Sequence, residues 1–309
     1  MKTQHFKLFG LAVLLLAGAL AFAQEQRVDR VVVPLSDPAK PARVEASVMR
    51  GSITVKGFEG KEVIVEAKVR EKTLIKIEEE DQEEIEAEIA EELREKRGQR
   101  RENRDRDDIK REEKAAGMKR ISGLATTGLE VEEEDNVVSV DAGSWKHTVD
   151  LTIQVPFSTH LELDTNLQGD IVVENIGGEI EVQNMNGSII LKNLSGIAMA
   201  ESMNGDVTVT MAKVTPGKPM SFSSMNGDID VTLPADLKAN IKMKTERGEI
   251  FSDFDVVLKP GPQKIEESHR EEGKFRISFD KSIFGTINGG GPELQFNTFN
   301  GDIYLRKKK

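Results

Sequence analysis

The sequence predicts an all-β protein in which units of about nine residues, each one strand and one turn, stack into a β-solenoid or β-roll-like coil. Glycine recurs every nine residues between positions 167 and 209, and apolar residues follow each glycine at the second and fourth places. Side chains alternate across a strand, so these apolar residues share one face. One unit cannot bury that face alone, and neighbouring units must stack to form a core.

The turn positions of this repeat are its glycines. They stand at Gly169, Gly178, Gly187, Gly196 and Gly205, with later copies at Gly227, Gly248 and Gly301. Two residues before each of the first five glycines stands a further apolar side chain, at Leu167, Ile176, Met185, Leu194 and Met203. We expect these residues to face the core as well, and Met225 to fill it in the same way.

Four copies of the repeat carry asparagine directly before the glycine, at Asn186, Asn204, Asn226 and Asn300. Asparagine and glycine accept positive φ at low cost, so Asn-Gly between apolar positions indicates a tight turn. These copies alternate with Gly178 and Gly196, which makes the full repeat eighteen residues. We therefore expect a coil of two strands and two turns, with the asparagines stacked on one edge and hydrogen-bonded between coils.

An acidic residue often follows the glycine, at Asp170, Glu179, Asp206, Asp228, Glu249 and Asp302. Stacking would place several carboxylates in one column, where like charges repel. Backbone N–H groups, water or a bound cation would relieve the repulsion. Calcium takes oxygen ligands, which makes Asp170, Glu179, Asp206, Asp228 and Asp302 weak calcium candidates. The Gly-Gly-x-Gly-x-Asp phrase of calcium-binding β-rolls is absent.

Four parts follow one another along the chain. Residues 1–23 have the basic start, apolar run and small-x-small site of a secretory signal peptide, with a retained anchor as the alternative. Residues 24–77 contain N-terminal β-strands and the first repeat copies. Residues 78–120 are almost wholly charged, and we expect a solvated helical or disordered insertion there, or a partner-binding arm. Residues 121–309 form the β-solenoid repeat domain, whose last copy would leave an open edge and permit end-to-end self-association.

The composition limits the cellular compartments and the classes of binding partner that we expect for this protein. The net charge of −11 argues against nucleic acid, because phosphate binding needs clustered lysine and arginine. The chain has no cysteine, so no disulfide supports the fold. No segment after the signal is long and apolar enough to span a membrane. We expect an exported protein of the periplasm, the cell envelope or the extracellular space.

No catalytic, cofactor-binding or metal-binding set stands out in the sequence. His147, His160 and His269 are isolated, and no Gly-x-Ser-x-Gly phrase or cysteine nucleophile is present. Glycoside hydrolysis would need two carboxylates about 5 to 9.5 Å apart in a cleft, and no such pair is distinguished. We therefore expect no enzyme and no cofactor.

The strands of residues 44–65, the Leu151-Thr-Ile-Gln-Val-Pro156 segment and the Gly-Asp-Ile/Val copies up to Leu233 resemble the DUF4097 putative-adhesin family of bacterial exported β-strand-repeat proteins. The resemblance implies a β-solenoid in the envelope or outside the cell and assigns no catalytic residue. It favours a non-enzymatic adhesin, scaffold or interaction module that binds an envelope or surface protein or polysaccharide. The alternatives are a calcium-binding surface β-roll protein and a carbohydrate-active β-helix enzyme.

Overall fold

The computed structural model describes residues 28–70, 127–143, 147–260 and 282–309, and the backbone of four two-residue strands between 265 and 279. The expected signal peptide and the charged insertion lie outside these residues. The chain divides into two units, and all but the first residue of the second, Arg70–Thr126, also lies outside them. The described residues form strands and turns without a helix, so none of them makes a helical membrane span.

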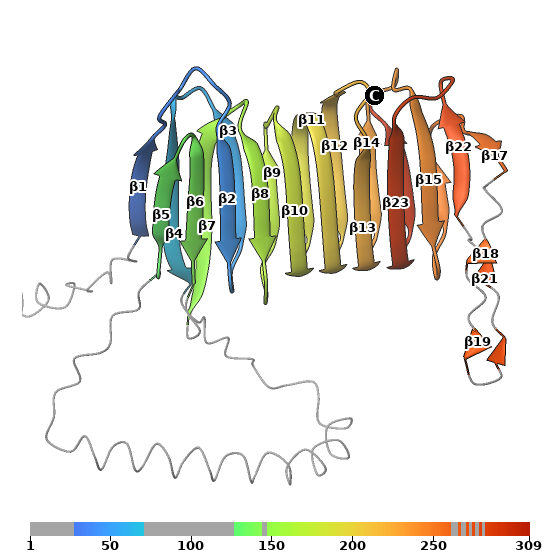
Figure 1. Ribbon diagram of the computed structural model, residues 1–309, viewed down its shortest axis with the longest axis horizontal. Helices are drawn as coiled ribbons and strands as arrows, with labels where there is room; N and C mark the ends of the chain where they lie inside the picture. Colours follow the sequence, from blue (N-terminus) through green and yellow to red (C-terminus); the bar gives the residue numbers. More distant parts are fainter. Residues whose placement is uncertain are drawn as a thin grey trace, which may run out of the picture. The chain divides into compact units, whose positions relative to one another are not determined.

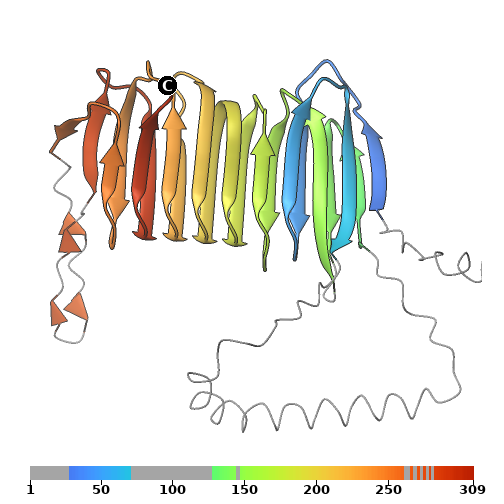
Figure 2. The same cartoon turned by 180° about the vertical axis from the view of Figure 1, so that it is seen from behind.

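Twenty strands form one continuous sheet that is folded into two facing layers, sheet A and sheet B (Figures 1 and 2). In spatial order, sheet A contains β1 (Val28–Pro34), β4 (Glu62–Arg70), β7 (Thr148–Pro156), β3 (Ile53–Phe58), β9 (Ile171–Glu174), the first part of β11 (Ile189–Asn204), β12 (Val207–Val214), β14 (Ile229–Leu233), β24 (Ile303–Lys307) and β16 (Ile250–Ser252). Sheet B contains β5 (Glu130–Glu134), β6 (Val137–Ala142), β2 (Arg43–Val48), β8 (His160–Thr165), β10 (Glu179–Asn186), the second part of β11, β13 (Met220–Asn226), β23 (Glu293–Asn300), β15 (Ala239–Thr245), β22 (Ile283–Ile287) and β17 (Val257–Lys259). Two further pairs, β18 (Ile265–Glu266) with β21 (Ser278–Phe279) and β19 (Arg270–Glu271) with β20 (Lys274–Phe275), lie apart from this sheet.

The middle of the stack is a parallel solenoid with the expected eighteen-residue coil. Ile171 pairs with Ile189, and Ile189 pairs with Val207, in parallel register. Antiparallel pairing appears in both sheets at one end, through β1–β4 and β5–β6, and in sheet B at the other end, through β15–β22–β17. Sheet A keeps parallel pairing at that second end, where the edge strands β16 and β17 have only three residues each, which limits further strand addition.

The coils do not stack in sequence order. The coil of β2 and β3 lies between the coil of β6 and β7 and the coil of β8 and β9. The C-terminal coil of β23 and β24 lies between β13 and β14 on one side and β15 and β16 on the other, so the C-terminus is inside the row of strands in Figure 1. The expectation of an open edge at residues 299–305 is therefore wrong, because both strands of that copy are paired on both sides. End-to-end self-association stays a prediction without that argument.

The core lies between the two sheets and is aliphatic along most of its length. The second and fourth residues after each glycine are buried as expected, from Ile171 and Val173 to Val207 and Val209. Phe222 and Phe296 pack there with ring centroids 5.6 Å apart. Burial of these rows supplies the main driving force for folding, since no disulfide is present.

A row of small polar side chains closes the core at one corner, the Asn-Gly corner, where sheet B turns into sheet A. Each of these side chains donates to the carbonyl of a turn glycine in a neighbouring coil. The bonds are Asn184 Nδ2 to Gly169 O at 2.8 Å, Ser202 Oγ to Gly187 O at 3.1 Å, Ser224 Oγ to Gly205 O at 3.0 Å and Thr298 Oγ1 to Gly227 O at 3.0 Å. The buried polar atoms are thereby satisfied, and the turns are fixed to one another.

This inward polar row corrects one expectation. Because Asn184 and Ser202 point inward, their neighbours Met185 and Met203 must point outward. They are 43% and 47% exposed, and Met225 is 53% exposed, so these methionines do not fill the core. Leu167 is also exposed, whereas Ile176 and Leu194, which precede the other corner, are buried as expected.

Candidate functional site

The edge of sheet B at the Asn-Gly corner carries an asparagine ladder. Asn204 Nδ2 donates to Asn186 Oδ1 at 2.9 Å, Asn226 Nδ2 to Asn204 Oδ1 at 2.9 Å, and Asn300 Nδ2 to Asn226 Oδ1 at 2.7 Å. Each amide therefore bonds the amide of the next coil. The ladder fixes the spacing and the orientation of the corner along four coils.

The aspartates of the same corner form a second ladder with the backbone. Ser188 N donates to Asp170 Oδ1 at 2.8 Å, Asp228 N to Asp206 Oδ1 at 2.9 Å, and Asp302 N to Asp228 Oδ1 at 2.8 Å. Glu249 N completes the series by donating to Asp302 Oδ1 at 2.8 Å. We expected backbone N–H groups, water or a cation to offset the repulsion between the carboxylates, and these hydrogen bonds are of the first kind.

Glu179 does not belong to that aspartate column. It begins β10 at the opposite corner, where its backbone N–H donates to His160 Nδ1 at 3.1 Å and its carboxylate pairs with Lys218 at 3.5 Å. Within the described ranges, no group of three or more His, Cys, Asp or Glu residues is arranged to hold a metal ion.

The outer face of sheet B carries an exposed apolar column beside the asparagine ladder. It consists of Leu167, Met185, Met203, Met225 and Phe299, which are between 41% and 53% exposed. Asn186, Asn204, Asn226 and Asn300 are register partners, so the four apolar residues that precede them also stand side by side on adjacent strands. At about 4.8 Å per strand the column is about 19 Å long. Arg247 lies over the ring of Phe299, 5.5 Å from its centroid.

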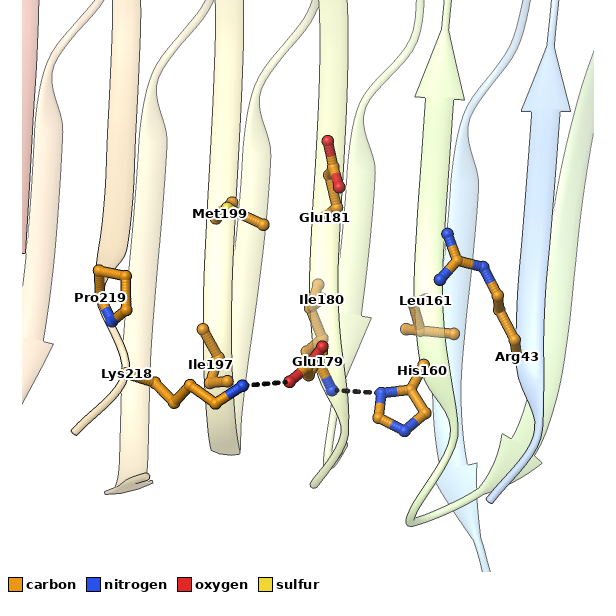
Figure 3. Close-up of a pocket in the computed structure, with 10 residues that line it drawn as sticks. All are labelled: Arg43, His160, Leu161, Glu179, Ile180, Glu181, Ile197, Met199, Lys218 and Pro219. Atoms are coloured by element: carbon orange, nitrogen blue, oxygen red, sulfur yellow. Dashed lines mark hydrogen bonds and ion pairs between the residues drawn. The ribbon is translucent and has the colours of Figure 1, made fainter. Parts of the chain in front are cut away.

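A shallow depression of about 220 Å³ lies on the same face, at the other end of the strands (Figure 3). Its walls carry charge of both signs. Lys218 and Glu179 form the ion pair on one side, and Arg43 donates to Glu45 at 2.7 Å and to Glu162 on the other. Met199, Ile197 and Pro219 supply the apolar part.

Three of the charged groups that line this depression, Arg43, Glu179 and Lys218, are paired. The hydrogen bonds that Arg43 donates to Glu45 and then to Glu162 raise the pKa of Arg43, so the guanidinium keeps its charge. Burial raises the pKa of Asp164, which points outward from β8. The depression therefore presents cationic, anionic and thioether surface side by side.

A second depression of about 670 Å³ lies where sheet A returns to sheet B. Pro216, Pro234 and Pro292 line it together with Lys213 and Lys238. Three connections between strands form this hollow: those after β12, after β14 and before β23.

The sequence identified the turn glycines, the asparagines and the acidic residues but missed the residues of the outer face. Met199, Arg43 and Lys218 were not identified from the sequence, because none of them belongs to a recognisable motif in its own segment. The sequence does contain a signal for the outer face, which is the alternation of side chains inside each strand. The polar residue three places before the glycine points inward at this corner, so the residue that follows it points outward.

Comparison with known proteins identifies the family of the chain. The sequence profile of the family described as Toastrack DUF4097 matches residues 148–306, just over half of the chain. The structure of a putative cell adhesion protein from Clostridium sporogenes is similar at 10% identity and a TM-score of 0.42, covering 92% of this chain and 100% of that one. A putative adhesin from Bacteroides fragilis is similar at 9% identity and a TM-score of 0.27, covering 91% of this chain and 97% of that one. No curated protein matches the sequence. On the evidence of the family profile, the chain belongs to the Toastrack DUF4097 family.

Proposed function

We propose that the protein is an exported, non-enzymatic binding module of the cell envelope or cell surface, which presents the outer face of sheet B in adhesion or scaffolding. The observation that carries this proposal is the exposed apolar column. Five large apolar side chains in one line would remain hydrated unless a partner covers them, and such stripes are typical of interaction sites.

The construction of the face supports the proposal. The asparagine ladder and the inward polar row hold successive coils together, so the column is ordered before a partner arrives. A preordered surface loses little conformational entropy on binding. The depression beside Arg43 and Glu179 adds charged groups that orient a partner.

Binding to intact cells and isolated envelopes tests this function. The full chain, with a fluorescent label, is titrated onto both, and the bound fraction is compared with that of Met203→Glu, which places a charge in the middle of the column. The matched control is Thr208→Glu, an exposed residue of β12 in sheet A on the same coil. We expect Met203→Glu to lose binding and Thr208→Glu to retain it. Absence of wild-type binding, or equal binding by all three proteins, refutes the proposal.

A further inference from the structure

The outer face of sheet B changes charge along the stack. At one end, six carboxylates point outward from β5, β6 and β8: Glu130, Glu132, Glu134, Asp141, Glu162 and Asp164. β2, which lies between β6 and β8, adds Glu45 and one cation, Arg43, which is paired with Glu45 and Glu162. At the other end, β15 and β17 present Lys242, Lys244 and Lys259, of which Lys244 is paired with Glu246 at 3.3 Å. The register places Lys242 and Lys259 on either side of Phe284, on the same face.

The apolar column lies between these two ends, and β11 is the central strand. Five strands of sheet B precede β11 in the stack and five follow it. Met199 and Met203 both point outward from β11 and are 43% and 47% exposed. The face is thus acidic, then apolar, then basic, with its apolar centre at the middle of the stack.

We propose that the outer face of sheet B binds a second copy of this chain, the two being related by a two-fold axis that runs parallel to β11. Rotation about such an axis reverses the order of the strands but keeps the strand direction. The apolar column of one copy therefore lies along the column of the other, and the acidic end of each lies over the basic end of its partner. The inference rests on the proposed function, because it names the occupant of the same face.

The registers of the strands specify which residues would oppose one another. Met203 meets its own copy at the axis, Met185 meets Met225, Glu45 meets Lys242 and His160 meets Glu293. Leu167 lies just beyond β8, and Asn186 Nδ2 donates to its carbonyl as Asn204 Nδ2 donates to that of Met185, which places Leu167 at the end of the column, opposite Phe299. Of these five oppositions, three are apolar with apolar, one is glutamate with lysine and one is glutamate with histidine. The same two-fold rotation therefore places the apolar column on its own copy and the acidic end on the basic end. An isologous interface requires this self-complementarity.

The size of the face is sufficient for a stable dimer. Eleven strands at about 4.8 Å span about 48 Å, and strands of about six residues are about 20 Å long, which gives about 1,000 Å². A standard interface buries about 800 Å² on each partner.

One residue opposes the arrangement and provides a sharp test. Glu201 points outward from β11 between Met199 and Met203, so it meets its own copy at the axis as a like-charge pair. Glu201→Gln removes that repulsion and should tighten the dimer about several-fold, an outcome that a partner of another kind would not produce.

Sedimentation velocity of the full chain from about 1 µM to about 100 µM measures the association. We expect the wild type to dimerise, Glu201→Gln to dimerise more tightly, Met203→Glu to weaken the dimer about a hundredfold, and the sheet A control Thr208→Glu to match the wild type. A monomeric wild type over this range, or an equal effect of Met203→Glu and Thr208→Glu, overturns the proposal.

A charge exchange establishes the orientation. Glu45→Lys and Lys242→Glu should each weaken self-association by about tenfold, because each opposes like charges at two places. Mixed in equal amounts, the two variants should form a heterodimer, since both oppositions are then lysine with glutamate. A mixture no tighter than either variant alone contradicts the two-fold arrangement. A monomeric wild type that still binds envelopes through Met203 would refute the dimer and leave the proposed function standing.

Discussion

The turn glycines allow close contact between neighbouring coils, so we expect Gly205→Ala to destabilise the fold strongly. Gly205 has a φ of 155°, and a Cβ added there would lie 2.2 Å from the carbonyl oxygen of Gly187 in the preceding coil. Ordinary carbon–oxygen contact begins near 3.4 Å, so the two coils would have to separate by about 1.2 Å.

That separation removes identifiable hydrogen bonds at the corner. Gly187 N donates to Asn204 O at 2.9 Å, Ile189 N donates to Asp206 O at 2.8 Å, and the ladder bond between Asn204 and Asn186 is 2.9 Å long. Three bonds at about 0.5–1.5 kcal/mol each, with about 1–2 kcal/mol of backbone strain for alanine at positive φ, give a loss of about 2.5–6.5 kcal/mol.

Urea unfolding followed by far-UV circular dichroism measures this loss, with Gly217→Ala as the matched control. Gly217 also has positive φ, 80°, but a Cβ there would meet no atom within 4 Å. Its replacement should therefore cost only the strain, about 1–2 kcal/mol. If the two variants lose stability to within about 1 kcal/mol of each other, contact between the coils is not what requires glycine at position 205.

Three other predictions concern the ladders, the core and the outer face. Asn204→Ala removes two ladder bonds and Asn300→Ala removes one. Urea unfolding should therefore show that the free energy of unfolding falls by about 1–3 kcal/mol for Asn204→Ala and by about 0.5–1.5 kcal/mol for Asn300→Ala. The reverse order would contradict the ladder. Phe222→Ala removes a buried ring and should lower the free energy of unfolding by about 3–5 kcal/mol. Met225 is exposed, so Met225→Ala should change that free energy by under about 0.5 kcal/mol. Similar losses would contradict the placement of Phe222 in the core and of Met225 on the outer face. Burial raises the pKa of Asp164 above its value in the unfolded chain, so the folded state loses stability as this carboxyl ionises with rising pH. Asp164→Asn should therefore raise the Tm relative to the wild type above about pH 4 and not below it, and a pH-independent difference would exclude this cause.

Much of the fold could be predicted because the repeat is visible in the sequence as a regular spacing of glycine, asparagine and apolar residues. The pairs Ile171 with Val173 and Val207 with Val209 are buried, as alternation around the glycines requires. The ladder of Asn186, Asn204, Asn226 and Asn300 follows from the eighteen-residue period, since identical residues one coil apart must stack.

The exposed column illustrates why the rest could not be read in this way. Met185 and Leu194 both stand two residues before a glycine, yet one is exposed and the other is buried. The difference arises at the corner, where Asn184 turns inward to bond Gly169 O in the neighbouring coil and thereby sets the alternation. That bond joins residues of different coils, so it belongs to the packing of the stack.

The sequence by itself determined the strand-and-turn unit, the eighteen-residue coil, the inward aliphatic rows and the asparagine edge, because these depend on alternation and on the backbone preferences of asparagine and glycine within one coil. Only the tertiary structure decided the order of the coils, and with it the charge gradient and the candidate binding face on sheet B. The physical reason is that the coils present nearly the same apolar inner rows and hydrogen-bonding edges to their neighbours. Local pattern therefore does not specify that β2 and β3 insert before β8, or that β23 and β24 insert between β13 and β15.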